Sequence, residues 1–150
     1  MREVRFYHLT RTPLEKALPD ILNKVLARGL RAVVMTGSAE RAEALSHALW
    51  TYDRTSFLPH GTARDGAPAE QPVWITPDDE NPNRADVLIL TDGADSQSGN
   101  FDLCCEFFDD RDEAAVLRAR QRWRAHAAAG QEVHYFRQSS DGWQVVAATI

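Results

Sequence analysis

Apolar residues recur at regular intervals near the start of the chain, and their spacing predicts a helix. Between Leu14 and Leu26 they fall three or four residues apart, which is typical of a helix with one face in a protein core. Thr12 is expected to cap this helix, with Glu15 closing a capping box, because both side chains can bind unpaired backbone groups of the first turn. Gly29 is expected to end the helix.

Two further helices are predicted from capping residues that precede apolar positions. Ser38 is expected to cap a helix with four apolar residues on its inner face, namely Ala42, Leu45, Ala48 and Leu49. Asp110 with Glu113 repeats the capping-box pattern and predicts a third helix. That helix is expected to end at Gly130, directly after a run of three alanines.

Short apolar runs between these segments predict strands. They lie around residues 4–6 and at residues 32–35, 73–75, 86–90, 101–108, 133–136 and 143–146. The last two flank the sequence Ser-Ser-Asp-Gly, which is typical of a β-hairpin turn. Residues 51–70 are predicted to be mainly loop. Strands that alternate with helices predict one α/β domain over residues 1–150, with a mostly parallel sheet and an antiparallel hairpin at its end.

Length and composition support a single globular domain and exclude several other classes. The chain has 150 residues, of which 43% are apolar and 26% charged, so disorder is excluded. Its apolar stretches are too short to span a membrane, and we expect no signal peptide. The adjacent Cys104 and Cys105 have neither disulfide-framework nor zinc-site spacing, so a reduced, cytoplasmic location is expected.

The distribution of arginine is uneven in a chain of net charge −5. The acidic balance argues against a protein whose whole surface binds nucleic acid. Yet five arginines lie in the predicted third helix: Arg111, Arg118, Arg120, Arg122 and Arg124. The inward stripe of this helix is predicted to hold Ala115, Ala119, Trp123 and Ala127.

Arg120 and Arg124 are neighbours on this helix, four residues apart, and Trp123 lies beside them. Guanidinium groups bind carboxylates bidentately, so this edge suits an acidic ligand that ends in an apolar or carboxylate group. The other interpretation is a solvated basic face, because cations are favoured near the C-terminal end of any helix. These residues alone leave both interpretations open.

Enzyme chemistry is not supported by the motifs of the chain. Thr36-Gly37-Ser38 lies where Rossmann-like folds bind phosphate, but it lacks the further glycines that this binding needs. Six acidic residues could hold Mg²⁺, although the last three are better explained as helix-start residues: Asp102, Glu106, Asp109, Asp110, Asp112 and Glu113. No metal-binding histidine motif or nucleophile motif is present. We therefore predict no catalytic residue, no metal and no cofactor.

Aromatic residues lie in and beside the predicted loop of residues 51–70. Trp50 precedes Phe57 and Leu58 in this polar stretch. Exposed aromatic side chains in loops can mark a surface that binds a partner protein. They can equally cover one edge of the sheet, and the sequence does not separate the two interpretations.

Several segments, taken in order, resemble the chi subunit family of bacterial DNA polymerase III. They are Arg5-Phe6-Tyr7-His8-Leu9, Ala48-Leu49-Trp50, Ser56-Phe57-Leu58-Pro59-His60-Gly61, Pro72-Val73-Trp74-Ile75, Asp86-Val87-Leu88-Ile89 and Arg120-Gln121-Arg122-Trp123-Arg124-Ala125-His126. The resemblance spans nearly the whole chain. It implies a non-catalytic protein with a Rossmann-like α/β fold and helices on both faces of the sheet.

The resemblance also implies partners. Such a protein links the clamp-loader side of the replicase to single-stranded-DNA-binding protein, so it reaches DNA only indirectly. The family's contact with the acidic C-terminal tail of that protein carries over to Arg120, Trp123 and Arg124. Better-known members have tyrosine and lysine where this chain has Trp123 and Arg124. Val116 stands where the family has another lysine, so one electrostatic contact with the tail is expected to be missing.

A second contact of the family, with the psi subunit, maps near Trp50, Phe57 and Leu58. Psi does not accompany chi in all bacteria, so another replicase subunit is the alternative partner for these residues. Two other functions stay open on the sequence. The first is a nucleotide-binding Rossmann-like enzyme, and the second is a module that binds nucleic acid directly.

Overall fold

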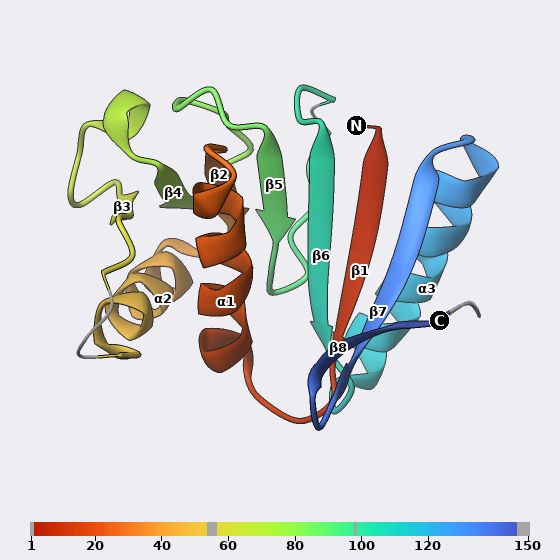
Figure 1. Cartoon of the computed structure of the whole chain (residues 1–150). Helices are drawn as coiled ribbons and strands as arrows, with labels where there is room; N and C mark the ends of the chain where they lie inside the picture. The colour runs from red at the N-terminus through yellow and green to blue at the C-terminus, as the bar shows by residue number, and fades with distance from the viewer. Residues whose placement is uncertain (1, 54–56, 98, 147–150) are drawn as a thin grey trace.

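A single sheet of eight strands organises the protein (Figure 1). The computed structural model describes residues 2–53, 57–97 and 99–146. In sheet order the strands are β3 (Gly61–Thr62), β4 (Val73–Thr76), β2 (Ala32–Met35), β5 (Val87–Leu90), β6 (Leu103–Asp109), β1 (Glu3–Leu9), β7 (Glu132–Ser139) and β8 (Gly142–Val146). Neighbouring strands are parallel except for the antiparallel pair β7 and β8.

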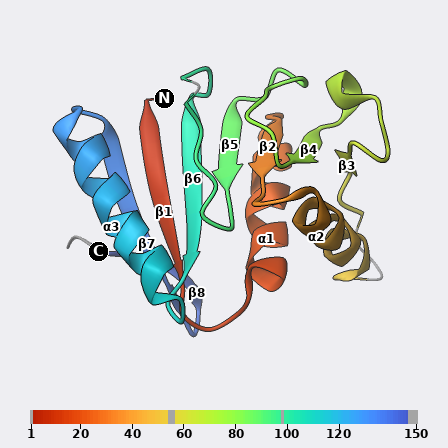
Figure 2. The same cartoon turned by 180° about the vertical axis from the view of Figure 1, so that it is seen from behind.

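Three helices pack against the two faces of the sheet. They are α1 (Leu14–Ala27), α2 (Ala39–Thr51) and α3 (Glu113–Ala128), and a short 3₁₀ helix, η1, covers Pro68–Glu70. Figure 1 shows α1 in front of the sheet, whereas Figure 2, seen from behind, brings α3 to the front. The α/β class, the mostly parallel sheet and the C-terminal hairpin are therefore confirmed. In the described ranges, no helix is both long and apolar enough to cross a membrane.

The core forms two layers, because successive residues of a strand point to opposite faces of the sheet. In β2, Val34 packs into the layer that contains apolar side chains of α1 and α2. Its neighbour Val33 packs into the layer that contains Ala119 of α3. All four residues of β2 are buried, as expected for a central strand covered on both sides.

The start of α1 differs from the prediction. Pro13 is the N-cap residue and makes no side-chain capping bond. The Thr12 side chain instead accepts a hydrogen bond of 2.6 Å from the side-chain nitrogen of Gln138 in β7. The side-chain oxygen of Gln138 accepts from the backbone N–H groups of Thr10, Arg11 and Thr12. The capping box that was predicted from Thr12 and Glu15 is therefore wrong.

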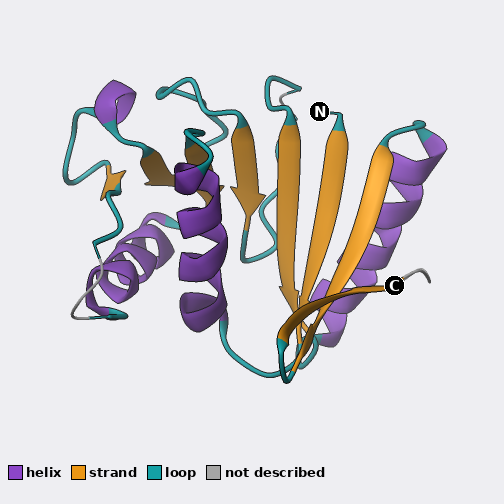
Figure 3. Cartoon of the chain, viewed as in Figure 1, coloured by secondary structure: helices purple, strands orange, loops and turns teal. Residues whose placement is uncertain are grey.

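The start of α3 differs by two residues, whereas that of α2 agrees. Ser38 caps α2 by accepting from the backbone N–H of Arg41. Asp112, and not the predicted Asp110, caps α3 by accepting from the backbone N–H of Ala115. Asp110 binds the ring of His8, 2.7 Å away. The stretch predicted as loop also contains the short strand β3 and η1 (Figure 3).

Candidate partner-binding sites

Helix α3 presents Arg120 and Arg124 to solvent, with Trp123 half-buried beside them. The Trp123 ring packs on Phe6 and Tyr135, at centroid distances of 5.7 and 6.3 Å. These contacts fix the indole against β1 and β7, so only part of it can contact a partner. The structure therefore brings the three predicted residues together on one edge of the helix.

The predicted inward stripe of α3 is only partly correct. Ala119 is buried and Ala115 is half-buried, but Ala127 is exposed near the end of the helix. Val116 packs against the core layer beneath α3. One turn before Arg120, this edge of the helix therefore carries an apolar side chain and no positive charge.

The arginines of this chain differ in whether a carboxylate neutralises them. Ion pairs join Arg5 to Glu3, Arg41 to Glu15 and Asp92, Arg111 to Asp109, and Arg122 to Glu106. Within the part of the chain that the structure describes, Arg120 and Arg124 are among the arginines that have no such partner. Two exposed guanidinium groups that lack an internal acid can bind an external one at little desolvation cost.

Arg122 has an internal role that the sequence analysis missed. It pairs with the buried Glu106 of β6 and donates hydrogen bonds to the carbonyl oxygens of Gly93 and Ala94, at 3.0 and 3.1 Å. Burial raises the pKa of Glu106 to about 7, although the guanidinium opposes this shift. One signal was available, because Glu106 interrupts an otherwise apolar strand and a buried acid needs a partner.

The second candidate surface lies at the end of α2 and in the loop after it. Trp50 is 46% exposed and Phe57 is 71% exposed, and their ring centroids are 5.6 Å apart. Leu58 is only 1% exposed and belongs to the core. We call Trp50 and Phe57 the aromatic patch. A partner can contact this patch, whereas Leu58 supports it from below.

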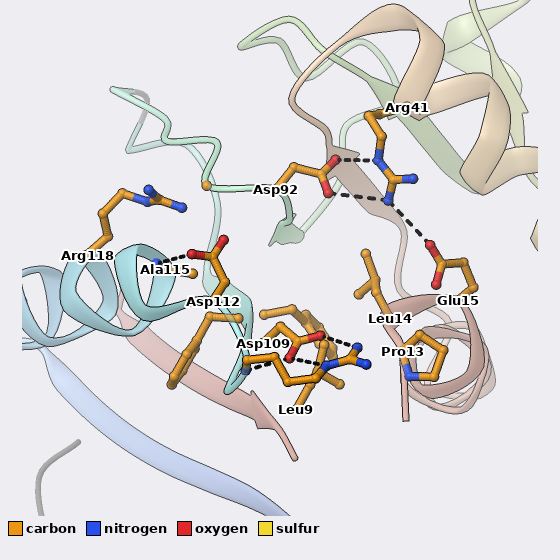
Figure 4. Close-up of a pocket in the computed structure, with 14 residues that line it drawn as sticks. Leu9, Pro13, Leu14, Glu15, Arg41, Asp92, Asp109, Asp112, Ala115 and Arg118 are labelled. Atoms are coloured by element: carbon orange, nitrogen blue, oxygen red, sulfur yellow. Dashed lines mark hydrogen bonds and ion pairs between the residues drawn. The ribbon is translucent and has the colours of Figure 1, made fainter. Parts of the chain in front are cut away.

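A cleft with a volume of about 490 Å³ lies at the carboxyl ends of β1 and β6 (Figure 4). The helices that follow these adjacent strands, α1 and α3, pack on opposite faces of the sheet. Open α/β sheets bind ligands at such switch points. Leu9, Leu14 and Phe107 give the cleft apolar walls, while charges of both signs, including Arg41 and Asp92, lie around it.

Carboxylates of the protein occupy the places at which this cleft could bind phosphate. Asp92 accepts from the backbone N–H of Gly37, at 3.2 Å, and pairs with Arg41 at the start of α2. At the start of α3, Asp112 accepts from the N–H of Ala115. A phosphate group would have to displace these carboxylates or meet their repulsion. The arrangement therefore disfavours the nucleotide-binding alternative.

Nucleotides are expected to leave the melting temperature of the protein unchanged. A ligand raises the melting temperature only if it binds the folded state, and both helix starts already hold carboxylates. Thermal unfolding with and without ATP or NAD tests this. A rise of several degrees that the substitution Gly37→Ala abolishes would contradict the prediction and support a nucleotide site.

The acidic residues that could hold Mg²⁺ do not converge on one point in the described structure. Glu106 pairs with Arg122, Asp109 with Arg111, and Asp110 lies against His8. Asp112 is the α3 cap described above. The two cysteines are buried, and burial raises the pKa of Cys105 to about 12, so its thiol is not a reactive nucleophile.

Comparison with known proteins places the chain in a family. A family model described as DNA polymerase III chi subunit, HolC, matches residues 1–134. The chain belongs to the DNA polymerase III chi subunit family. This match includes the aromatic patch and the whole of α3, whereas β8 lies beyond it.

Two chi relatives extend the comparison. The probable DNA polymerase III subunit chi of Rickettsia prowazekii (strain Madrid E) is 35% identical over 95 residues, which cover 63% of this chain and 58% of that protein. The DNA polymerase III subunit chi of Escherichia coli (strain K12) is 30% identical over 120 residues, which cover 78% of this chain and 80% of that protein. The chain thus spans less than two thirds of the Rickettsia relative.

Proposed function

We propose that this chi-family protein is a non-catalytic accessory subunit of the bacterial DNA polymerase III holoenzyme that acts in DNA replication. It binds the acidic C-terminal tail of single-stranded-DNA-binding protein and links that protein to the clamp-loader side of the replicase. The observation that carries the proposal is the pair of exposed guanidinium groups, Arg120 and Arg124, which have no internal carboxylate among the described residues and lie beside Trp123.

The chemistry of this edge fits a tail that is acidic and ends in an aromatic residue. Arg120 and Arg124 bind carboxylates of the tail through charge-assisted hydrogen bonds. Trp123 offers an indole surface for the terminal aromatic ring, and its contacts with Phe6 and Tyr135 hold that surface in place before binding. An indole that is already ordered loses little conformational entropy when the tail binds.

Calorimetric titration of the full chain with the tail peptide tests the proposal. The peptide is titrated with and without its terminal residue, because the two forms separate the charged contribution from the apolar one. The proposal expects binding of the full peptide and weaker binding of the shortened one. Absence of heat with both peptides would leave Arg120 and Arg124 as an ordinary solvated helix face.

The aromatic patch is the proposed docking surface for a second replicase subunit, psi where the host has one. Two neighbouring exposed aromatic side chains are characteristic of the centre of a protein interface. The exposure of Trp50 and Phe57 supports this interpretation over the alternative, in which both would cover the edge of the sheet.

Substitution of Phe57 in the aromatic patch is expected to affect partner binding, whereas substitution of its neighbour Leu58 is expected to affect stability. Phe57→Ala should leave the melting temperature nearly unchanged and weaken subunit binding by about 2 kcal/mol or more, since the ring is exposed. Leu58→Ala should destabilise the fold by roughly 2–5 kcal/mol, because it creates a cavity in the core. Chemical denaturation and binding titration of both variants check this. Unfolding caused by Phe57→Ala would show that the ring is part of the core.

A further inference from the structure

Leu117 is an exposed leucine on α3 that takes no part in the core. Its exposed fraction is 55%, and it belongs to neither of the two core layers of the described structure. Its neighbour Val116, in contrast, packs inward. The other large apolar side chains that are exposed in the described ranges are Trp50 and Phe57 of the aromatic patch and Val145 of β8. The fold therefore leaves the side chain of Leu117 available to a partner.

The position of Leu117 on α3 distinguishes it from an isolated exposed leucine, which is common on protein surfaces. Residues three and seven positions apart lie on the same side of a helix, so Leu117 shares a side with Arg120 and Arg124. Since each residue turns the helix by about 100°, the two arginines lie between Leu117 and Trp123 around its circumference. We call the side of α3 that carries Arg120, Trp123 and Arg124 the tail edge. Leu117 borders this edge opposite the indole.

The charge of this side of α3 changes one turn before Leu117. Glu113 lies four residues earlier, in the first turn of the helix. A carboxylate of a bound peptide would be repelled by Glu113, so the stretch of α3 that favours acidic residues ends at Leu117. An apolar side chain of the peptide fits at this boundary, because Glu113 does not repel it and its contact with Leu117 removes apolar surface from water.

The separation of Leu117 from Trp123 sets the length of peptide between them. The two residues are about 9 Å apart along the helix axis and roughly 120° apart around it, since each residue advances about 1.5 Å and turns about 100°. With a helix radius of about 5 Å including side chains, the two side chains are roughly 12 Å apart. An extended peptide covers this distance in about four residues. Carboxylates within that interval lie over Arg120 and Arg124.

We propose that Leu117 is a specificity-determining residue of the tail edge, which contacts an apolar side chain that precedes the acidic residues of the tail. This role of Leu117 rests on the proposed function, because it concerns the same partner. Trp123 contacts the terminal aromatic residue, and the two arginines bind the carboxylates that follow it upstream. Leu117 then contacts an apolar residue at least about four positions before the end. The edge thereby distinguishes a peptide with two apolar groups from one that is only acidic at that position.

Replacing Leu117 by alanine should affect binding and leave the fold intact. The side chain is exposed, and alanine is the strongest helix former, so the melting temperature of Leu117→Ala should stay close to that of the wild type. Val145→Ala is the matched control. Val145 is also an exposed apolar residue, with an exposed fraction of 64%, but it lies on β8 at the edge of the sheet.

Calorimetric titration of the full chain with two synthetic peptides tests the role of Leu117. Both peptides carry an acidic run and a terminal phenylalanine, and they differ only in a leucine or a serine placed before the acidic run. The wild type and Val145→Ala should bind the leucine peptide about fivefold more tightly, as expected when two apolar side chains become partly buried. Leu117→Ala should bind the two peptides equally well.

The preference of the wild type for the leucine peptide should persist when salt is added, because screening weakens charge pairs and not apolar contacts. Three results would overturn the role of Leu117: no preference in the wild type, a preference that added salt removes, or an equal preference in Leu117→Ala. Each leaves the proposed function standing, since both peptides still bind. Absence of binding of either peptide to the wild type would instead refute the proposed function, and the role of Leu117 with it.

Discussion

Reversing the charge of Arg120 and Arg124 together is expected to weaken binding of the acidic tail peptide by about a hundredfold or more, without loss of the fold. Each hydrogen bond between a guanidinium and a carboxylate contributes roughly 1.5–3 kcal/mol, and a reversed charge adds repulsion. Both side chains are exposed and lie outside the core, so the melting temperature should change little. Calorimetric titration of the double variant Arg120→Glu/Arg124→Glu checks the prediction.

Two comparisons make this experiment specific. Arg64→Glu is the matched control, because Arg64 is also exposed but follows β3 at the opposite end of the sheet from α3. It should bind the tail as the wild type does. Wild-type affinity should also fall with added salt toward a residual value supplied by Trp123, since screening weakens exposed charges but not apolar contacts. Equal loss in Arg64→Glu and in the single variant Arg124→Glu, which change the net charge by the same amount, would indicate a general effect of net charge and no specific site.

Replacing Arg122 by alanine is expected to destabilise the protein by roughly 3–5 kcal/mol above neutral pH. The substitution leaves the carboxylate of Glu106 buried without its partner, which is the costly way to break a buried ion pair. It also removes the hydrogen bonds to the carbonyl oxygens of Gly93 and Ala94. Arg118→Ala, one turn earlier on α3, is the control, since no ion pair of Arg118 is found in the described residues. Arg118→Ala should lower the free energy of unfolding by far less than Arg122→Ala.

The pH dependence of this effect follows from the raised pKa of Glu106. Folding moves that pKa from 4.5 to about 7, so the folded state binds the proton more tightly than the unfolded state. The contribution of this tighter proton binding to the free energy of unfolding is fully present below about pH 4.5 and is lost as pH rises through about 7. In Arg122→Ala the pKa rises further, so the destabilisation should be smaller near pH 5 than near pH 8. Denaturant unfolding at both pH values, with Glu106→Gln as reference, checks this, and a cost independent of pH would contradict it.

The sequence predicted most elements because their signals are local. Periodic apolar residues placed α1, and Ser38 marked the start of α2 as expected. The failures involve partners that are distant in the chain. Gln138 supplies the groups that bind the backbone at Thr12, and no local pattern could reveal a contact across 126 residues. Similarly, Asp110 resembles a cap in sequence but binds His8 in the fold.

In the candidate sites, too, the sequence predicted what depends on local spacing and missed what depends on a distant element. Helical spacing was sufficient to place Arg120, Trp123 and Arg124 on one edge of α3. It could not separate them from Arg122, because the role of Arg122 depends on Glu106 in another element. In the loop after α2, Phe57 and Leu58 are adjacent in sequence but differ completely in exposure. An irregular segment has no fixed period from which the direction of a side chain could be inferred.

The order of the strands sets a distance between the two candidate surfaces. The aromatic patch lies at the β3 end of the sheet, and α3 packs over β6, β1 and β7. From β3 to β1 the order gives five strand spacings, or roughly 24 Å. The hydrogen-bonded sheet is a stiff spacer over this length, so the two proposed partners would contact separate parts of the protein. A variant with substitutions at both surfaces should accordingly lose binding free energy for the two partners equal to the sum of the losses in the separate variants.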